Sequence, residues 1–223
     1  MKTLFVPKVS AQGIPAEGVP ALLDAQGIGF QPIDQVNWPD YPYRPQAEFR
    51  IAHTGDSLLL HFRVTEASVR AVAAEDNGRV WEDACVEFFI QTDEREPLYY
   101  NIECNCAGTL LIGHGIRGQR THASREVMES VGRWASLGRA PFEVRKGTCS
   151  WELVEVIPVS ALFADRVTSL DGKVWKANFY KCGDMLQTPH FLSWNPIDLP
   201  EPCFHCPDFF GQIAFGGPEE KAV

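Results

Sequence analysis

Hydrophobic and polar residues alternate along the segment 80–111, the most regular stretch of the chain. Alternation with a period of two is typical of a β-strand with one buried face. A polar loop, TDEREP, separates the two halves, so the pattern predicts an antiparallel hairpin with one face buried and the other displayed. The apolar face would carry Ala84, Val86, Phe88, Ile90, Tyr100, Ile102, Cys104 and Cys106, and the polar face Asp83, Cys85, Glu87, Phe89, Gln91, Asn101, Glu103 and Asn105.

This hairpin has a register that places two carboxylates side by side. Facing residues of an antiparallel pair have a constant sum of numbers, and one even sum sets Glu87 opposite Glu103, with Asn101 beside them. Facing carboxylates are unfavourable alone, but a cation, a proton or a row of ligand hydroxyls between them stabilises the pair. Without a cation we expect one of the two to have a raised pKa. A solvated sheet face in a slightly different register is the alternative.

The rest of the pattern predicts many short strands and few helices. Strands are expected at 2–9, 47–53, 57–65, 142–145, 150–158, 174–182 and 212–215, with 142–145 and 150–158 forming a hairpin. Short helices are expected at 66–74 and 126–137, a helical turn at 159–163, a basic loop at 114–125 and an extended proline-rich segment at 37–45. This order predicts an all-β fold, a two-sheet antiparallel, jelly-roll-like β-sandwich. We expect one domain, 1–223, with a frayed tail at 216–223.

The composition fits this fold and argues against several partners. The 223 residues include 16 prolines and 18 glycines, which suit short strands joined by turns. A net charge of −9 argues against nucleic acid or an anionic membrane as a partner, and no apolar run is long enough to span a bilayer. The start, MKTLFVPKVSAQG, lacks the pattern of a signal peptide, so a cytoplasmic location is expected. Most of the seven cysteines are expected to be free, buried thiols in a reducing compartment.

The sequence contains none of the common catalytic motifs that we considered. GxSxG, HExxH and P-loop sequences are absent. Glu87 and Glu103 could form the acid and base of a glycosidase, which keeps a hydrolase as one alternative. Cys203 and Cys206 have the CxxC spacing of zinc ligands, and the CNC sequence at 104–106 offers a second pair, although buried thiols are favoured. A haem-binding protein is a further alternative.

Two tryptophans lie where predicted strands begin or end beside polar turns. Trp81 follows DNGR, and Trp194 lies in LSWNP, in phase with His190 and Leu192. An exposed tryptophan stacks on the apolar face of a sugar ring while nearby polar groups bind its hydroxyls; a core position is the alternative. On a straight strand Trp81 and Glu87 would lie ~20 Å apart, so they share a ligand only if the chain folds back around 82–84.

Several segments together resemble the family 9 carbohydrate-binding modules, and more closely the stand-alone family 9-like proteins of bacteria. They are VWEDACVEFFI, YYNIECNCAGTLL, WELVEVIP, WKANFYKCGD, PHFLSWNPI and FHCPDFFGQIAF, with VNWPDYPYRP also in place. The resemblance covers residues 33–215 and implies a β-sandwich related to the DOMON-like group. In better-known members two tryptophans clamp a sugar, and polar side chains bind its hydroxyls.

The resemblance implies non-catalytic carbohydrate binding with weak affinity. Trp81 and Trp194 would form the clamp, and Glu87 would accept hydrogen bonds from sugar hydroxyls. Supporting contacts would come from Asn178, Tyr180 and Arg117 or Arg120. To these the polar face of the hairpin adds Asn101 and Glu103, and the phase shared with Trp194 adds His190. No cofactor is expected, although family members can hold structural calcium. The expected partner is a saccharide, with a glycan-degrading enzyme as a second partner in carbohydrate catabolism; a protein-interaction scaffold is the remaining alternative.

Overall fold

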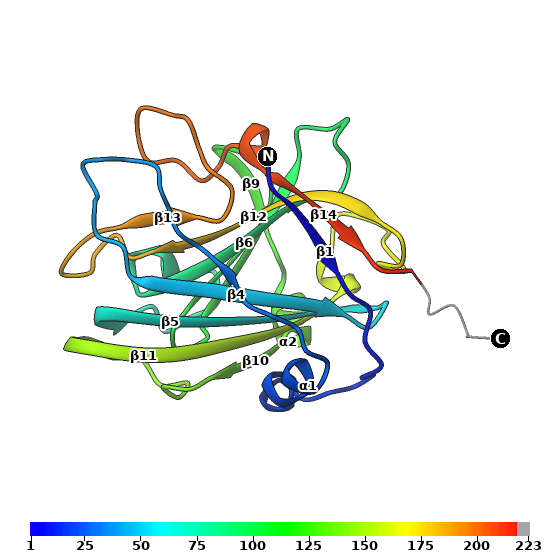
Figure 1. The fold of residues 1–223 in the computed structure, drawn as a ribbon, viewed down its shortest axis with the longest axis horizontal. Coiled ribbons are helices and arrows are strands. Elements are labelled where there is room, and N and C mark those ends of the chain that lie inside the picture. The colour runs from blue at the N-terminus through cyan, green and yellow to red at the C-terminus, as the bar shows by residue number, and fades with distance from the viewer. Residues whose placement is uncertain (218–223) are drawn as a thin grey trace.

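A computed structural model of the chain describes residues 1–217 and shows two stacked β-sheets (Figure 1). Seven strands of the larger sheet follow one another as β1 (Thr3–Val6), β14 (Gly211–Phe215), β12 (Val174–Cys182), β6 (Cys85–Gln91), β7 (Tyr99–Asn105), β8 (Leu110–Ile116) and β9 (Gln119–His122). Two more, β13 (Phe191–Ser193) and β3 (Gln35–Val36), extend from β12. The smaller sheet contains β10 (Gly132–Ala135), β11 (Phe142–Pro158), β5 (Ser57–Ala71), β4 (Gln46–His53) and β2 (Gln31–Pro32).

Apart from the parallel pair β1–β14, neighbouring strands run antiparallel, which confirms the expected two-sheet sandwich. The helices are short: α1 (Val19–Ala25), α2 (Arg125–Ser130) and the 3₁₀ turns η1 (Ala16–Gly18), η2 (Val80–Glu82), η3 (Val159–Ala161) and η4 (Pro207–Phe209). Helix α1 covers the outer face of the smaller sheet, where Val19 and Leu23 pack with Leu59 and Val154. None of the helices in residues 1–217 has the length and apolarity needed to cross a bilayer.

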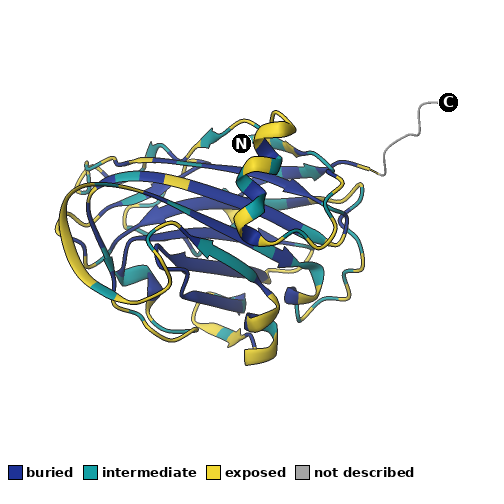
Figure 2. Ribbon diagram, turned by 90° about the horizontal axis from the view of Figure 1, so that it is seen from below, coloured by how far each residue is buried: buried dark blue, intermediate teal, exposed yellow. Residues whose placement is uncertain are grey.

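The main hydrophobic core lies between the two sheets, and the strands that enclose it are mostly buried along their length (Figure 2). The apolar face of the hairpin β6–β7 points into this core. Phe88 and Ile102 are cross-strand partners there, and Phe88 stacks on Phe179 of β12 with ring centroids 4.9 Å apart. The hairpin and the direction of its apolar face are therefore as the alternation predicts.

The opposite face of the hairpin is not displayed to solvent as expected. Every residue of β6 and β7 is buried, because a second hydrophobic cluster covers the outer face of the larger sheet. Trp38, from the proline-rich segment 37–45, and Ile197 and Phe204, from the long segment after β13, pack in this cluster. Polar residues of the hairpin are consequently enclosed by loops that approach the sheet from distant parts of the sequence.

Two expected elements differ because cross-strand pairing overrides local preference. The segment 66–74, predicted helical from its alanines and charges, instead continues β5 as far as Ala71. There Val69 and Ala71 point into the main core and the strand pairs with β11. Likewise, β11 is one strand of 17 residues with two irregularities rather than a hairpin at KGT.

Three other predictions need smaller corrections. The basic segment 114–125 is part of a hairpin, β8–β9, whose turn contains Gly118 with a φ of 79°. The predicted helix 126–137 is the shorter α2 followed by β10. Helix α1 lies in a region where no helix is expected. The predicted tail, 216–223, falls mostly outside the described residues.

Candidate functional site

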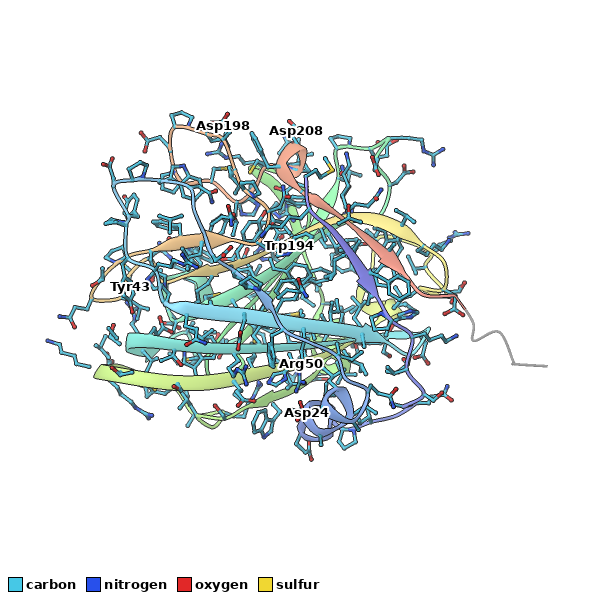
Figure 3. All side chains as sticks on the ribbon, viewed as in Figure 1. Asp24, Tyr43, Arg50, Trp194, Asp198 and Asp208 are labelled. Atoms are coloured by element: carbon cyan, nitrogen blue, oxygen red, sulfur yellow. The ribbon has the colours of Figure 1, made fainter. Side chains whose placement is uncertain are left out.

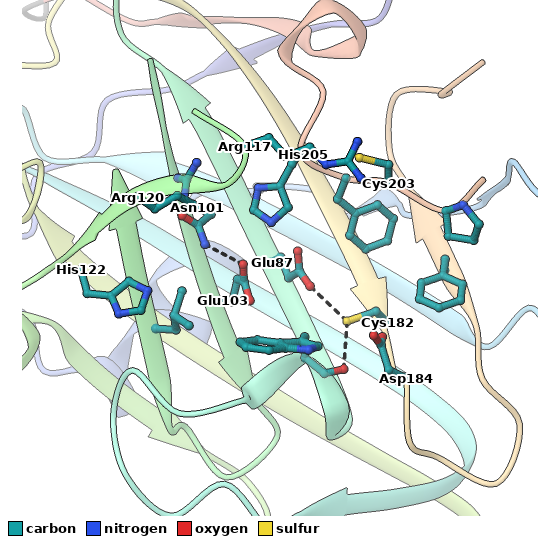
Figure 4. A pocket seen from close by; sticks show the side chains of 15 residues that line it. Glu87, Asn101, Glu103, Arg117, Arg120, His122, Cys182, Asp184, Cys203 and His205 are labelled. Atoms are coloured by element: carbon teal, nitrogen blue, oxygen red, sulfur yellow. Dashed lines mark hydrogen bonds between the residues drawn. The ribbon is translucent and has the colours of Figure 1, made fainter. Parts of the chain in front are cut away.

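A pocket of about 380 Å³ opens on the outer face of the larger sheet (Figure 4). Its floor is formed by β6, β7, β8 and the end of β12, and its walls come from η2, the β8–β9 hairpin and the segment 191–205. The residues that line it are Trp81, Glu87, Asn101, Glu103, Leu111, Arg117, Arg120, His122, Cys182, Asp184, Phe191, Pro202, Cys203, Phe204 and His205. The pocket thus combines regular strands below with irregular segments around the rim.

The two carboxylates on the floor are cross-strand partners, as the predicted register requires. Glu87 faces Glu103, and both are buried. The Nδ2 atom of Asn101 donates to Glu103 Oε1 at 2.7 Å. The thiol of Cys182 donates to Glu87 Oε1 at 3.0 Å, and Figure 4 shows both hydrogen bonds on the pocket floor.

Burial disfavours the charged form of each acidic group at this site. It raises the pKa of Glu87 well above the usual range, and the nearby Cys182 and Glu103 add to the increase. Burial also raises the pKa of Glu103 to about 7, against a lowering by Asn101 and Arg120. The pKa of Asp184 is raised to about 6, chiefly by burial and then by Glu82. Burial thus acts in the direction expected for the carboxylate pair, and it acts on both groups rather than on one.

Two polar atoms beside the carboxylates have no hydrogen-bond partner among the described residues, 1–217. They are Oδ1 of Asn101, an acceptor, and Nε of Arg120, a donor. The rest of the Arg120 guanidinium is held by the carbonyls of Tyr99, Gly113 and Gly115 at 3.0–3.2 Å and lies over the Tyr99 ring. Buried polar atoms are normally paired, so these two atoms mark a place where a partner is missing.

Gly113 provides the space for both of these atoms. A Cβ added at this position would lie 2.5 Å from Asn101 Oδ1 and 3.1 Å from Arg120 Nε. The absence of a side chain at Gly113 therefore lets an acceptor from β7 and a donor from β9 approach each other above β8.

Trp81 reaches the pocket because the chain folds back directly after it. Trp81 lies in η2, and the backbone N–H groups of Asp184 and Met185 bond to the carbonyls of Trp81 and Glu82 at 3.2 and 3.1 Å. Trp81 and Glu87 consequently line one pocket. On the sequence alone, the two residues could share a ligand only if the chain folded back around 82–84, and the structure meets this requirement.

Six of the ten residues predicted for the site line the pocket. They are Trp81, Glu87, Asn101, Glu103, Arg117 and Arg120. The other four, Asn178, Tyr180, His190 and Trp194, do not line it and are buried elsewhere.

The largest correction concerns Trp194, the expected second clamp residue. It is 2% exposed and lies between the sheets, edge-on to Phe49 and Phe179 with ring centroids 6.1 and 5.7 Å away. Figure 3 shows it near the middle of the molecule, below the segments that carry Asp198 and Asp208. The reason is the phase of β13: the side of Leu192 and Trp194 faces the main core, whereas Phe191 faces the pocket.

The other three residues predicted for the site but absent from the pocket make structural contacts instead. His190 shares that inward side and bonds to Lys181 Nζ at 2.8 Å; burial and this lysine lower its pKa to about 3. Asn178 accepts from the backbone N–H of Asn195 at 2.8 Å and donates to that residue's carbonyl. The hydroxyl of Tyr180 donates to the carbonyl of Phe204 at 3.2 Å. Asn178 and Tyr180 thus hold the segment that covers the sheet rather than line the pocket.

Nine lining residues were not predicted, and only some of them left a signal in the sequence. Leu111 is the cross-strand partner of Glu103, so extending the hairpin register by one strand would have identified it. His205 and Cys203 belong to the CxxC segment, which was considered only as a metal motif. The remaining unpredicted residues are His122, Cys182, Asp184, Phe191, Pro202 and Phe204.

The cysteines are all free, and their positions separate the two pairs considered as zinc ligands. Cys104 and Cys106 lie in the core between the sheets, whereas Cys203 and Cys206 lie on the outer side of the larger sheet. In the part of the chain that the structure describes, one cluster brings three metal-ligand side chains together, namely Cys85, Glu87 and Cys182.

Comparison with known proteins gives one family and several similar structures. Residues 17–215 match the model of carbohydrate-binding family 9. A candidate carbohydrate-binding protein from Bacteroides uniformis ATCC 8492 is 62% identical, with 96% of this chain and 99% of that chain covered and a TM-score of 0.94. No curated protein matches the chain.

Two structures of a carbohydrate binding module family 9 protein from Caldicellulosiruptor kristjanssonii are also similar. The complex with glucose has a TM-score of 0.62 at 12% identity, covering 98% of each chain. The complex with cellotriose has a TM-score of 0.60 at 12% identity, covering 100% of this chain and 97% of that chain. At this identity the likeness concerns the fold.

Proposed function

The chain belongs to carbohydrate-binding family 9, and we propose that it binds a saccharide in the pocket on the outer face of the larger sheet. The family establishes the class of protein, and the geometry of the pocket supports the location. Sugars present hydroxyl groups around an apolar ring face, so their sites combine polar side chains with aromatic surfaces. This pocket has carboxylates, an amide and an arginine on or near its floor, with aromatic side chains around it.

The unpaired atoms of Asn101 and Arg120 carry the proposal. A hydroxyl group both donates and accepts a hydrogen bond. After rotation of the two side chains, whose unpaired atoms are buried, a single sugar hydroxyl could donate to Asn101 Oδ1 and accept from Arg120 Nε. Glu87 and Glu103 lie on the adjoining strands and offer oxygens to neighbouring hydroxyls. The site therefore provides hydrogen-bond donors and acceptors for adjacent hydroxyls of one sugar ring.

The aromatic contacts differ from the clamp that the sequence predicted. Trp81 keeps its proposed role as a stacking surface, whereas Phe191 and Phe204 take the place of Trp194 as the other large aromatic residues of the pocket. A volume of about 380 Å³ is at the small end of ligand pockets. It suits a monosaccharide or one end of a short chain rather than a long polysaccharide lying across a surface.

Isothermal titration calorimetry with glucose, cellotriose and a panel of other mono- and oligosaccharides tests the proposal. We expect saturable one-site binding of at least one sugar, with a Kd between micromolar and millimolar. Asn101→Ala should weaken this binding at least tenfold. The matched control, Phe5→Ala, removes an aromatic ring that is 64% exposed on β1, far from the pocket residues in the sheet order, and should leave the affinity unchanged.

The proposal fails if no sugar binds a folded sample, or if Asn101→Ala and Phe5→Ala have equal affinity. In the first case a protein-interaction scaffold becomes the better account. A role in glycan breakdown beside a glycan-degrading enzyme, and a cytoplasmic location, stay predictions from the sequence.

A further inference from the structure

We propose that Cys85, Glu87 and Cys182 form a binding site for one thiophilic divalent cation of the zinc class at the floor of the pocket. Each residue offers one ligand atom, and the three atoms lie within 4.8 Å of one another. A metal site here is a function separate from saccharide binding. It also differs from the Cys203–Cys206 pair, whose CxxC spacing made it a zinc candidate in the sequence. The argument rests on register, access and ligand chemistry.

The register of two central strands brings the three side chains together. Cys85 of β6 is the cross-strand partner of Cys182 of β12, and facing side chains point to the same side of the sheet. Glu87 lies two residues further along β6 and so shares that side. Both strands have neighbours on each side in the sheet and are buried near this end. The ligand atoms are therefore carried by rigid elements rather than by loops.

The separations are compatible with a tetrahedral ion after small side-chain movements. Zn–S bonds of ~2.3 Å and Zn–O bonds of ~2.1 Å place tetrahedral ligand atoms roughly 3.5–3.8 Å apart. Cys182 Sγ and Glu87 Oε1 are 3.0 Å apart as a hydrogen-bonded pair. An ion would replace this hydrogen bond and move the two atoms apart by less than an ångström.

The ligand types select the class of metal. Thiolates bind zinc and other borderline or soft cations, whereas calcium and magnesium prefer six or more oxygen ligands. Binding releases the two thiol protons and the proton of the Glu87 carboxyl group to solvent, so all three groups bind as anions. Two thiolates and one carboxylate carry three negative charges, which a dication reduces to one.

Access to the cluster comes from the pocket. Cys182 and Glu87 line the pocket, and Cys85 lies behind them in full burial. Three protein ligands leave the fourth position of a tetrahedral ion facing the cavity, where water or a sugar hydroxyl would complete the coordination.

Titration of the fully reduced protein with Co²⁺ tests the site directly, without any saccharide. Thiolate–cobalt bonding gives a charge-transfer absorption in the near ultraviolet, and tetrahedral cobalt gives strong visible bands. We expect both to saturate at one Co²⁺ per chain and to disappear when Zn²⁺ is added. Cys85→Ser and Cys182→Ser should each weaken Co²⁺ binding at least tenfold, and Glu87→Gln should weaken it less.

Cys203→Ser is the matched control, because Cys203 also lines the pocket but is outside the cluster; its Co²⁺ spectrum should equal that of the parent. A measurement on the unmutated protein guards against variants that do not fold. Zn²⁺ should slow alkylation of Cys182, located by mass spectrometry, and leave Cys203 reactive. Because these readouts need no sugar, their failure leaves the proposed saccharide binding intact.

Three results would overturn the inference. One is the absence of a thiolate–cobalt band in the folded, reduced protein. Another is a band that persists in Cys85→Ser and Cys182→Ser but is lost in Cys203→Ser. The third is alkylation of Cys182 that proceeds in the metal-free protein and is not slowed by Zn²⁺.

Discussion

The two faces of the hairpin β6–β7 are buried equally but differ in chemistry. On the inner face, Phe88 and Ile102 pair within the apolar core between the sheets. On the outer face, Glu87 and Glu103 pair beneath a cover of loops, next to an amide whose oxygen has no partner. Burial of apolar groups stabilises the fold, whereas burial of carboxyl groups without full hydrogen bonding destabilises it.

This contrast teaches that burial alone does not identify a structural role. The inner face stabilises the sandwich, because its apolar side chains are packed in the main core. The outer face retains groups that an apolar core would replace, which is typical of sites kept for a ligand. We therefore expect substitutions on the inner face to affect mainly stability and those on the outer face mainly ligand binding.

The largest expected effect is on the inner face. Phe88→Ala should lower the free energy of unfolding by about 3–5 kcal/mol, because it removes a ring from the close-packed core. Urea denaturation followed by far-UV circular dichroism measures this, with Glu87→Gln on the outer face as the comparison. Equal destabilisation by the two substitutions would contradict the distinction between the faces.

The next effect concerns the pH dependence of stability. Burial raises the pKa of Glu103 to about 7 from 4.5, so the folded state holds this proton more tightly than the unfolded state. The stability that this group contributes is full below pH 4.5 and is lost as the pH rises through 7. Glu103→Gln cannot titrate, so it should gain about 2–3 kcal/mol relative to the parent between pH 5 and pH 8.

The comparison with the variant is needed because other groups titrate nearby. Glu155, whose pKa burial also raises to about 7, has the same sign as Glu103. His190 and His205 have pKa values lowered by burial, to about 3 and about 4, and have the opposite sign below pH 6.5. Urea denaturation at several pH values measures the difference; a difference that does not change with pH would contradict the assignment.

The third expected effect is that of an outer-face substitution on the affinity for a saccharide. Glu87→Gln should weaken saccharide binding by about 1–1.5 kcal/mol, the upper part of the range for hydrogen bonds between neutral groups, because burial disfavours the charged form of Glu87. Glu126→Gln, at an exposed position on α2, is the control and should bind normally. Calorimetry gives the affinity, and an assay for released reducing sugar separates binding from hydrolysis. Turnover by the parent that Glu87→Gln abolishes would favour a glycosidase instead.

The smallest expected effect on affinity is that of replacing Trp81, and it distinguishes this residue from Trp194. Trp81→Ala should weaken saccharide binding by about 0.5–1.5 kcal/mol through loss of stacking. Trp194→Phe should leave affinity unchanged and lower the melting temperature, because the residue packs in the main core. Calorimetry and thermal denaturation on both variants measure this, and weaker binding by both variants would restore the clamp first predicted.

The sequence predicts those parts of the molecule that follow from local periodicity. The alternation in 80–111 is enough to give the hairpin and its inner face. Parity restricts the register to those that pair polar with polar residues, and the structure has the one that sets Glu87 opposite Glu103. β12 likewise has its predicted bounds. By contrast, the helix expected at 66–74 was wrong, since pairing with β11 outweighed helix propensity.

The covering segments could not be predicted in the same way. Residues 183–210 have many prolines and little periodicity, so neither their path over the sheet nor the phase of β13 follows from their sequence. That phase decides whether Phe191 or Trp194 faces the pocket. It depends on the contacts that Asn178 and Tyr180 make with the covering segment, which are long-range in sequence.

The most direct test of the account is an NMR titration that follows the indole N–H signals of the six tryptophans as the saccharide that binds in calorimetry is added. The account predicts that the Trp81 signal shifts and saturates, while the Trp194 signal stays in place because its ring is enclosed between the sheets. Assignment by Trp81→Phe and Trp194→Phe identifies the two signals. A shift of Trp194 with no shift of Trp81 would contradict the location of the site on the outer face.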